Sequence, residues 1–87
     1  MKISNQYVLR EVAGNYVVVP VGKEAIRLNA IIHLNSVGAF IFEHLQEEDL
    51  TVKQIVDLVL DEYDIDEETA NKDVLAFISK LEENKIL

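Results

Sequence analysis

The stretch HLNSVGAFIFEHLQ, residues 33–46, contains the point at which a predicted sheet gives way to a predicted helix. The overlapping segment AIIHL, residues 30–34, is short, apolar and rich in β-branched side chains, which favours a strand. Asparagine is a preferred N-terminal helix cap, so we expect the strand to end and the helix to begin at Asn35. From there to about residue 46 the apolar side chains recur at helical spacing, at Val37, Phe40, Ile41 and Leu45.

Two further strands are predicted before this junction. Residues 7–12 and 16–21 are rich in β-branched and aromatic side chains, and the Gly14-Asn15 pair between them is typical of a two-residue hairpin loop. Pro20 has no N–H for a sheet ladder, so we expect it near the end of the second strand or on its unpaired side. Residues 23–29 connect this hairpin to the third strand, whose start falls between Ile26 and Ala30.

A second helix follows an acidic turn. Thr51 and Gln54 have the spacing of a capping box, in which each satisfies a backbone N–H group near the other. Leu50 and Ile55 are placed as the hydrophobic staple that accompanies such a box. The pattern predicts a helix over about residues 52–63.

A third helix begins after Asp66, which is its predicted cap. The first turn carries two glutamates, which favour the positive end of the helix dipole. Asn84 is placed to end the helix, so that residues 85–87 fold back onto the core. The apolar stripe of this helix consists of Ala70, Val74, Phe77, Ile78 and Leu81. Residues 1–87 are therefore predicted to form one α+β domain, a winged-helix-like arrangement of a three-stranded antiparallel sheet followed by three helices.

The charge and composition of the chain exclude several classes of protein. Sixteen acidic residues against eight basic ones give a net charge of -8, which opposes contact with the phosphate backbone of nucleic acids. No apolar run reaches the roughly 18 residues of a membrane span, and the N-terminal segment has no hydrophobic signal region. The absence of cysteine excludes a disulfide framework. We expect a soluble, cytoplasmic protein that binds neither nucleic acid nor membranes.

Few side chains form a pattern that could carry catalysis. Asn35-Ser36 loosely resembles the Asp-Ser of acyl carrier proteins, but those are helical throughout, and here we expect one of the two residues to cap the helix. His33 and His44 are the two histidines, and no spacing joins them to carboxylates as a metal motif. The sequence contains no recognisable nucleophile with its base and no phosphate-binding glycine loop. We therefore predict a protein that is not an enzyme and holds neither a metal nor a cofactor.

The order and spacing of the apolar positions resemble those of the PqqD family over nearly the whole chain. These are small proteins of pyrroloquinoline quinone biosynthesis and its relatives, also called recognition elements of ribosomally made, modified peptides. This chain departs from the family pattern in having Asn84 where many relatives have glycine, and in its longer connection at residues 23–29. The resemblance rests on Leu9-Arg10, on VVVPVG at residues 17–22, on Leu34-Asn35 with Gly38 and Ile41, on residues 51–56, and on Asp73-Val74 with Phe77, Ile78, Leu81 and Ile86-Leu87.

The resemblance implies a non-catalytic peptide chaperone. Such a protein binds the leader of a precursor peptide and presents it to a modifying enzyme, often a radical S-adenosylmethionine (radical SAM) protein. An edge strand leaves unpaired N–H and C=O groups, with which an extended peptide pairs while its alternate side chains enter a groove. In the family this groove lies between the third strand and the third helix. Carried over to this chain, the peptide-binding residues are Ala30, Ile31, Ile32, His33 and Leu34 on the strand, and Asp73, Ala76, Phe77 and Lys80 on one stripe of the helix.

Two other classes of function stay open from the sequence. A winged-helix DNA-binding regulator would use the third helix for recognition, yet residues 66–83 carry six acids and only Lys72 and Lys80 as bases. An acyl-carrier-like protein would be modified on Ser36. Tight DNA binding that falls steeply with salt would favour the first class. A mass gain at Ser36 in the presence of a phosphopantetheinyl transferase would favour the second.

Overall fold

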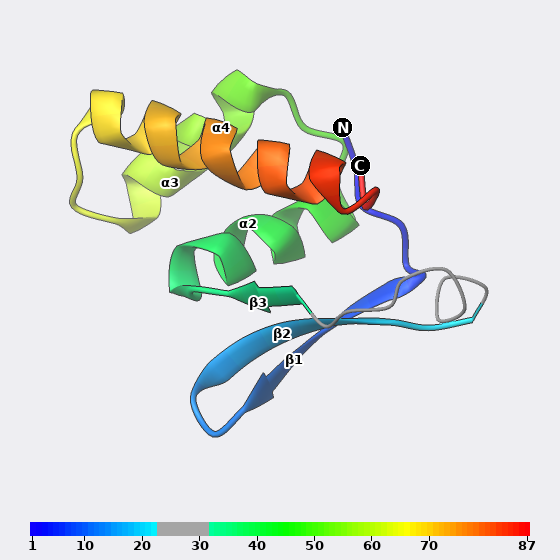
Figure 1. Cartoon of the computed structure of the whole chain (residues 1–87). Coiled ribbons are helices and arrows are strands. Elements are labelled where there is room, and N and C mark those ends of the chain that lie inside the picture. The colour runs from blue at the N-terminus through cyan, green and yellow to red at the C-terminus, as the bar shows by residue number, and fades with distance from the viewer. Residues whose placement is uncertain (23–31) are drawn as a thin grey trace.

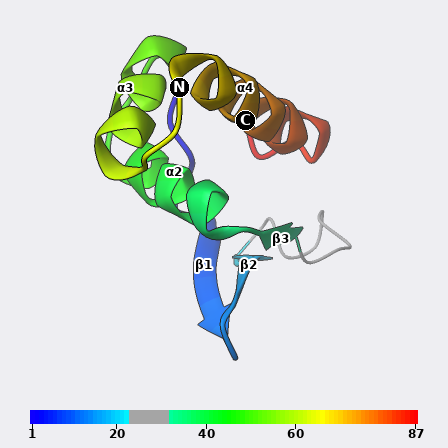
Figure 2. The same ribbon diagram turned by 90° about the vertical axis from the view of Figure 1, so that its left-hand side faces the viewer.

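Three strands come before three helices in the computed structural model, which describes residues 1–22 and 32–87. The elements are β1 (Tyr7–Val12), β2 (Asn15–Pro20), β3 (Ile32–Leu34), α2 (Ser36–Glu47), α3 (Val52–Glu62) and α4 (Glu67–Glu83). Neighbouring strands pair antiparallel, in the order β1-β2-β3. Helix α2 lies nearest the sheet, and α3 and α4 lie on the far side of α2 (Figure 1 and Figure 2). For the part of the chain that the structure describes, the predicted α+β fold is confirmed.

The β1–β2 hairpin turns one residue earlier than the sequence suggested. Val12 pairs with Asn15, so the two-residue loop is Ala13-Gly14 and not Gly14-Asn15. Both loop residues have positive φ, 52° at Ala13 and 81° at Gly14, as a turn whose twist matches the flanking strands requires. Alanine rarely adopts a positive φ, so local sequence preference does not predict it at this position. The pairing of Val12 with Asn15 places Ala13 in the loop. Strand β2 accordingly covers Asn15–Pro20 rather than residues 16–21, and Pro20 ends it as expected.

The core lies between one face of the sheet and the helices. Val18 and its partner Ile32 are both buried on this face, whereas His33, the next residue of β3, is exposed on the other. The largest fully buried side chains come from all three helices, from β2 and from the segment before β1, namely Phe42, Ile3, Leu45, Ile55, Leu81, Val18, Val59 and Val74. Within residues 1–22 and 32–87, no helix has the length and apolar character needed to cross a membrane.

Side-chain caps fix where each helix begins. The Asn35 amide oxygen accepts a hydrogen bond from the Gly38 N–H at 2.8 Å, so α2 begins after Asn35 as predicted. Thr51 and Gln54 form the reciprocal capping box at the start of α3. Asp66 caps α4 in the same way as Asn35 caps α2. These boundaries are local features of the sequence, because each cap satisfies N–H groups only three residues away.

Helix α4 ends in a left-handed turn at Lys85. The Lys85 N–H donates to the carbonyl of Glu82 at 3.0 Å, and the next N–H, of Ile86, donates to the carbonyl of Leu81 at 2.9 Å. Glycine is the usual occupant of the left-handed position in this motif, whereas here lysine adopts it with a φ of 59°. Asn84 stands at the helix end as predicted. Ile86 is buried, which confirms that the last residues fold back onto the core.

Candidate functional site

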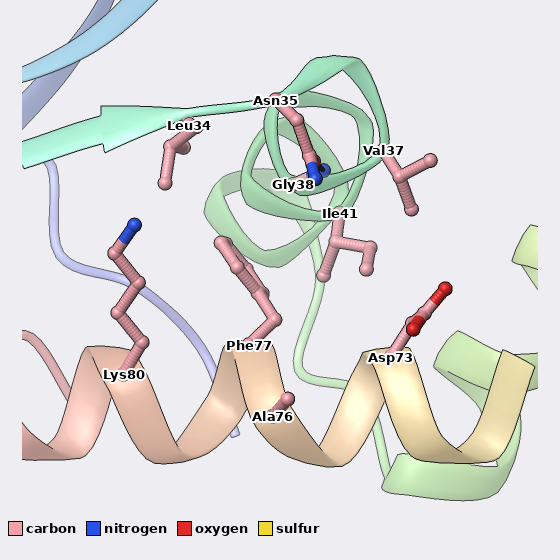
Figure 3. A pocket seen from close by; sticks show the side chains of 9 residues that line it. All are labelled: Leu34, Asn35, Val37, Gly38, Ile41, Asp73, Ala76, Phe77 and Lys80. Carbon is pink, nitrogen blue, oxygen red and sulfur yellow. Dashed lines mark hydrogen bonds between the residues drawn. The ribbon is translucent and has the colours of Figure 1, made fainter. Parts of the chain in front are cut away.

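A groove opens between the β3–α2 junction and helix α4 (Figure 3). Its volume of about 270 Å³ lies just below the usual range of small-molecule pockets, which is roughly 300–1,000 Å³. The residues that line the groove are Leu34 at the end of β3, the α2 cap Asn35, Val37, Gly38 and Ile41 on α2, and Asp73, Ala76, Phe77 and Lys80 on α4.

Phe77 forms the floor of the groove where α4 meets the first turn of α2. A Cβ atom at position 38 would lie only 3.1 Å from Cε1 of the Phe77 ring, so Gly38 permits this close approach. Phe77 keeps 9% of its surface exposed, which places it in the core and in the groove wall at once. The side chain that fixes the helix packing therefore also shapes the groove.

Strand β3 forms the edge of the sheet beside the groove. Among residues 1–22 and 32–87, no strand other than β2 pairs with it. The Val21 N–H donates to the Gln6 carbonyl at 2.7 Å, just beyond the β1–β2 ladder. In an antiparallel ladder, hydrogen-bonded residue pairs alternate with pairs that are not hydrogen-bonded, so this bond sets which residues of β2 face β1 and which face β3. This alternation directs the backbone groups of Ile32 and Leu34 toward β2 and those of His33 away from it. Among the described residues of β3, His33 is therefore the one whose N–H and C=O point to the open edge, where a further strand could pair.

A hydrogen bond from Lys80 shows directly that the His33 carbonyl points away from β2. The Lys80 ammonium donates to this carbonyl at 2.7 Å, joining α4 to the outer side of β3. Asp73 lies two helical turns away at the other end of the groove (Figure 3). The groove thus has a positive end and a negative end. Between them it is apolar, lined by Leu34, Val37, Ile41, Ala76 and Phe77.

The structure brings most of the sequence-predicted site residues together. Leu34, Asp73, Ala76, Phe77 and Lys80 all line the groove. Ile32 and His33 belong to the adjoining strand, whereas Ala30 and Ile31 lie outside the described residues.

The α2 wall was not among the predicted site residues. Its members are Asn35, Val37, Gly38 and Ile41. The signal that could have identified it was the glycine one turn into an apolar helix, because an interior helix glycine usually has a packing reason.

The other residues considered from the sequence lie elsewhere. Ser36 is the exposed first residue of α2, next to the Asn35 cap. His44 packs edge-on against Phe40, with ring centroids 4.6 Å apart. In the described part of the chain, no three or more histidine, aspartate or glutamate side chains are grouped to hold a metal ion.

The family model described as "Coenzyme PQQ synthesis protein D (PqqD)" matches residues 15–87. This chain belongs to the PqqD family. Every described groove residue lies inside the matched region, whereas β1, with the Leu9-Arg10 pair, lies before it. A search of the curated proteins found no match.

Two solved structures share the fold of this PqqD family member. One is "TbiB1 in Complex with the TbiA(beta) Leader Peptide", at a TM-score of 0.75 and 26% identity, covering 100% of this chain and 94% of that chain. The other is "Lasso peptide synthetase B1 complexed with the leader peptide", at a TM-score of 0.70 and 18% identity, covering 95% of this chain and 91% of that chain. The likeness to TbiB1 includes β1, so the whole PqqD-like domain, hairpin included, is a shared architecture.

Proposed function

We propose that this PqqD family protein binds the leader segment of a precursor peptide as an added strand on β3 and presents it to a modifying enzyme. The observation that carries the proposal is the outward-facing backbone of His33 directly beside the apolar groove. TbiB1, which is similar to this chain at 26% identity, is in complex with a leader peptide, and this supports a leader peptide as the ligand.

Strand addition would divide recognition between backbone and side chains. The N–H and C=O of His33 supply hydrogen bonds that are independent of the peptide sequence. Successive side chains of an extended peptide point to opposite faces, so every second one faces the groove. Phe77 and Ile41 then select apolar side chains by burying them, at roughly 25 cal/mol for each Å² of apolar surface removed from water.

In this proposal the domain supplies no catalytic group, and a partner enzyme carries out the modification. Two of the polar groove residues already hold structural hydrogen bonds. The Asn35 amide oxygen accepts from the Gly38 N–H, and the Lys80 ammonium donates to the His33 carbonyl. The family resemblance suggests a radical SAM protein as the class of partner.

Titration of the ¹⁵N-labelled protein with a leader peptide encoded beside its gene tests the proposal. Amide shifts are expected at residues 32–38 and 73–80, while α3 stays unaffected. Shifts confined to the β1–β2 hairpin or to α3 would contradict binding in this groove.

His33→Pro is the sharpest variant for the same titration. Proline removes the outward N–H of His33, whereas the N–H groups that face β2 remain. Affinity should fall roughly tenfold for the lost hydrogen bond and the ring placed at the edge. His33→Val is the matched control, because it changes the same exposed side chain and keeps the donor. Equal affinity of the two folded variants would show that the peptide does not pair with β3.

A further inference from the structure

Among the described residues that line the groove, Lys80 is the one with a basic side chain, in a protein whose net charge is -8. Asp73, the acidic lining residue, is seven positions away on α4, or about 10 Å along the helix axis. A negatively charged peptide side chain would therefore be repelled over most of this surface. Beside Lys80 it would find an ammonium.

In the free protein the Lys80 ammonium occupies the acceptor that an added strand needs. It donates to the His33 carbonyl at 2.7 Å. The ion pairs of the described residues join Met1 to Asp49 and Lys53 to Asp57, so none of them holds Lys80. A charged group placed over an edge strand also hinders unintended pairing with other chains. Lys80 thus closes the edge at His33 while no peptide is bound.

A peptide that adds to β3 must take over this acceptor with its own backbone N–H. The exchange breaks a hydrogen bond made by a charged donor, which is stronger than the neutral bond that replaces it. The exchange becomes favourable when the peptide also supplies a new acceptor for the ammonium. A carboxylate is the strongest such acceptor, whereas a lysine or arginine of the peptide would meet an unpaired positive charge.

The strand geometry sets where that carboxylate must be. The peptide residue paired with His33 shares its face of the sheet, which is the exposed one. The residues on either side of it face the groove, one opposite Leu34 and the other opposite Ile32. Figure 3 shows Lys80 on the side of Leu34 that is away from Asn35. An apolar side chain opposite Leu34 would enter the groove, and the carboxylate two residues from it would reach Lys80.

We propose that Lys80 selects leader peptides that carry an aspartate or glutamate two residues from an apolar anchor. This inference rests on the proposed function and adds a charge rule to it. Lys80 has two roles in succession, first as the cap of the free β3 edge and then as the partner of the peptide carboxylate.

A phage-displayed library of random short peptides, panned against the immobilised full chain, tests the rule. The wild-type protein should enrich peptides with an apolar residue and an acid two positions away. Lys80→Glu should reverse the charge preference to lysine or arginine. Lys80→Met, which keeps an apolar stem, should retain the apolar preference and lose the charge preference.

Lys72→Glu is the matched control. Lys72 is exposed on the same helix and does not line the groove, so this variant makes the same charge change and should keep the wild-type preference. For one selected synthetic peptide, changing the acid to its amide should weaken wild-type binding about tenfold and leave Lys80→Met binding nearly unchanged.

The outcomes separate the two levels of the proposal. Enriched peptides without an acid, or with the same acid in the Lys80→Glu selection, would overturn the role of Lys80 and leave strand addition standing. If none of the folded proteins enriches any extended apolar peptide, strand addition itself is contradicted.

Discussion

Gly38 and Phe77 lie close together at the floor of the groove. The Phe77 ring would come within 3.1 Å of a Cβ at position 38, and its open side faces the groove. Alanine at this position would therefore displace the ring into the groove. Glycine here serves the binding surface more than the helix, since glycine inside a helix is intrinsically unfavourable.

We expect Gly38→Ala to weaken peptide binding while changing stability by less than about 1 kcal/mol. The helix gains roughly 0.5–1 kcal/mol from the exchange of glycine for alanine, which offsets the crowding of a ring that can tilt outward. Chemical denaturation and leader titration measure the two effects. Phe77→Leu and the double variant Gly38→Ala, Phe77→Leu complete a double-mutant cycle. In the Phe77→Leu background Gly38→Ala should cost less affinity, because the smaller side chain relieves the crowding. Undiminished affinity in the Gly38→Ala variant would contradict the role of Gly38 in shaping the groove.

At the scale of elements, α4 carries the whole far wall of the groove, and its start is fixed by one side chain. The Asp66 carboxylate accepts a hydrogen bond from the Thr69 N–H at 2.7 Å. The pKa of Asp66 lies below its usual range. The larger cause is a hydrogen bond from the Thr69 hydroxyl, and the smaller is the hydrogen bond from the Thr69 backbone N–H. The stability of the first turn of α4 therefore depends on pH.

The sign of this linkage follows from the lowered pKa. A carboxyl group whose pKa is lower in the folded protein stabilises the fold above its unfolded pKa of about 4, and this stabilisation is lost as the pH falls through the folded pKa. Asp66→Asn keeps a capping oxygen but does not titrate, so its melting temperature should fall less steeply than that of the wild type below about pH 4. Thermal unfolding across this range measures the difference. An Asp66→Asn curve parallel to that of the wild type would contradict the linkage.

The whole molecule depends on a small core shared by the sheet and the helices. A chain of 87 residues buries only about 60–65% of the surface it exposes when unfolded. Phe42 is fully buried in this core and belongs to α2, the helix between the sheet and the outer helix layer (Figure 1 and Figure 2). The same core holds β3 and α4 apart at the width of the groove, so loss of core packing would also remove the groove.

We expect Phe42→Ala to destabilise the protein by about 3–5 kcal/mol, because it removes buried apolar surface and leaves a cavity. Small domains have a total stability of roughly 5–15 kcal/mol, so this variant should be largely unfolded in mild denaturant. Urea denaturation monitored by circular dichroism measures the change. Leu75→Ala, on a side chain that is 54% exposed, should change stability by no more than about 0.5 kcal/mol. Similar effects of the two substitutions would contradict the assignment of Phe42 to the core.

Features whose physical cause lies within a few residues could be predicted from the amino-acid sequence. Asn35, the Thr51 and Gln54 box and Asp66 set the helix starts, since each side chain bonds an N–H three positions away. The helical stripe of Asp73, Ala76, Phe77 and Lys80 was likewise predictable, because helix periodicity puts those positions on one face. The family pattern then led to the prediction that this face binds the peptide, and in the structure the face lines the groove.

Features that depend on pairing between distant residues could be seen only in the folded structure. The left-handed Ala13 follows from the register of the hairpin, and the outward backbone of His33 follows from the same register carried across β2. The second wall of the groove depends on how closely α4 approaches Gly38, and the Lys80 bond to His33 joins residues 47 positions apart. Local propensity cannot specify such contacts, because they exist only after the core has fixed the sheet and α4 against each other.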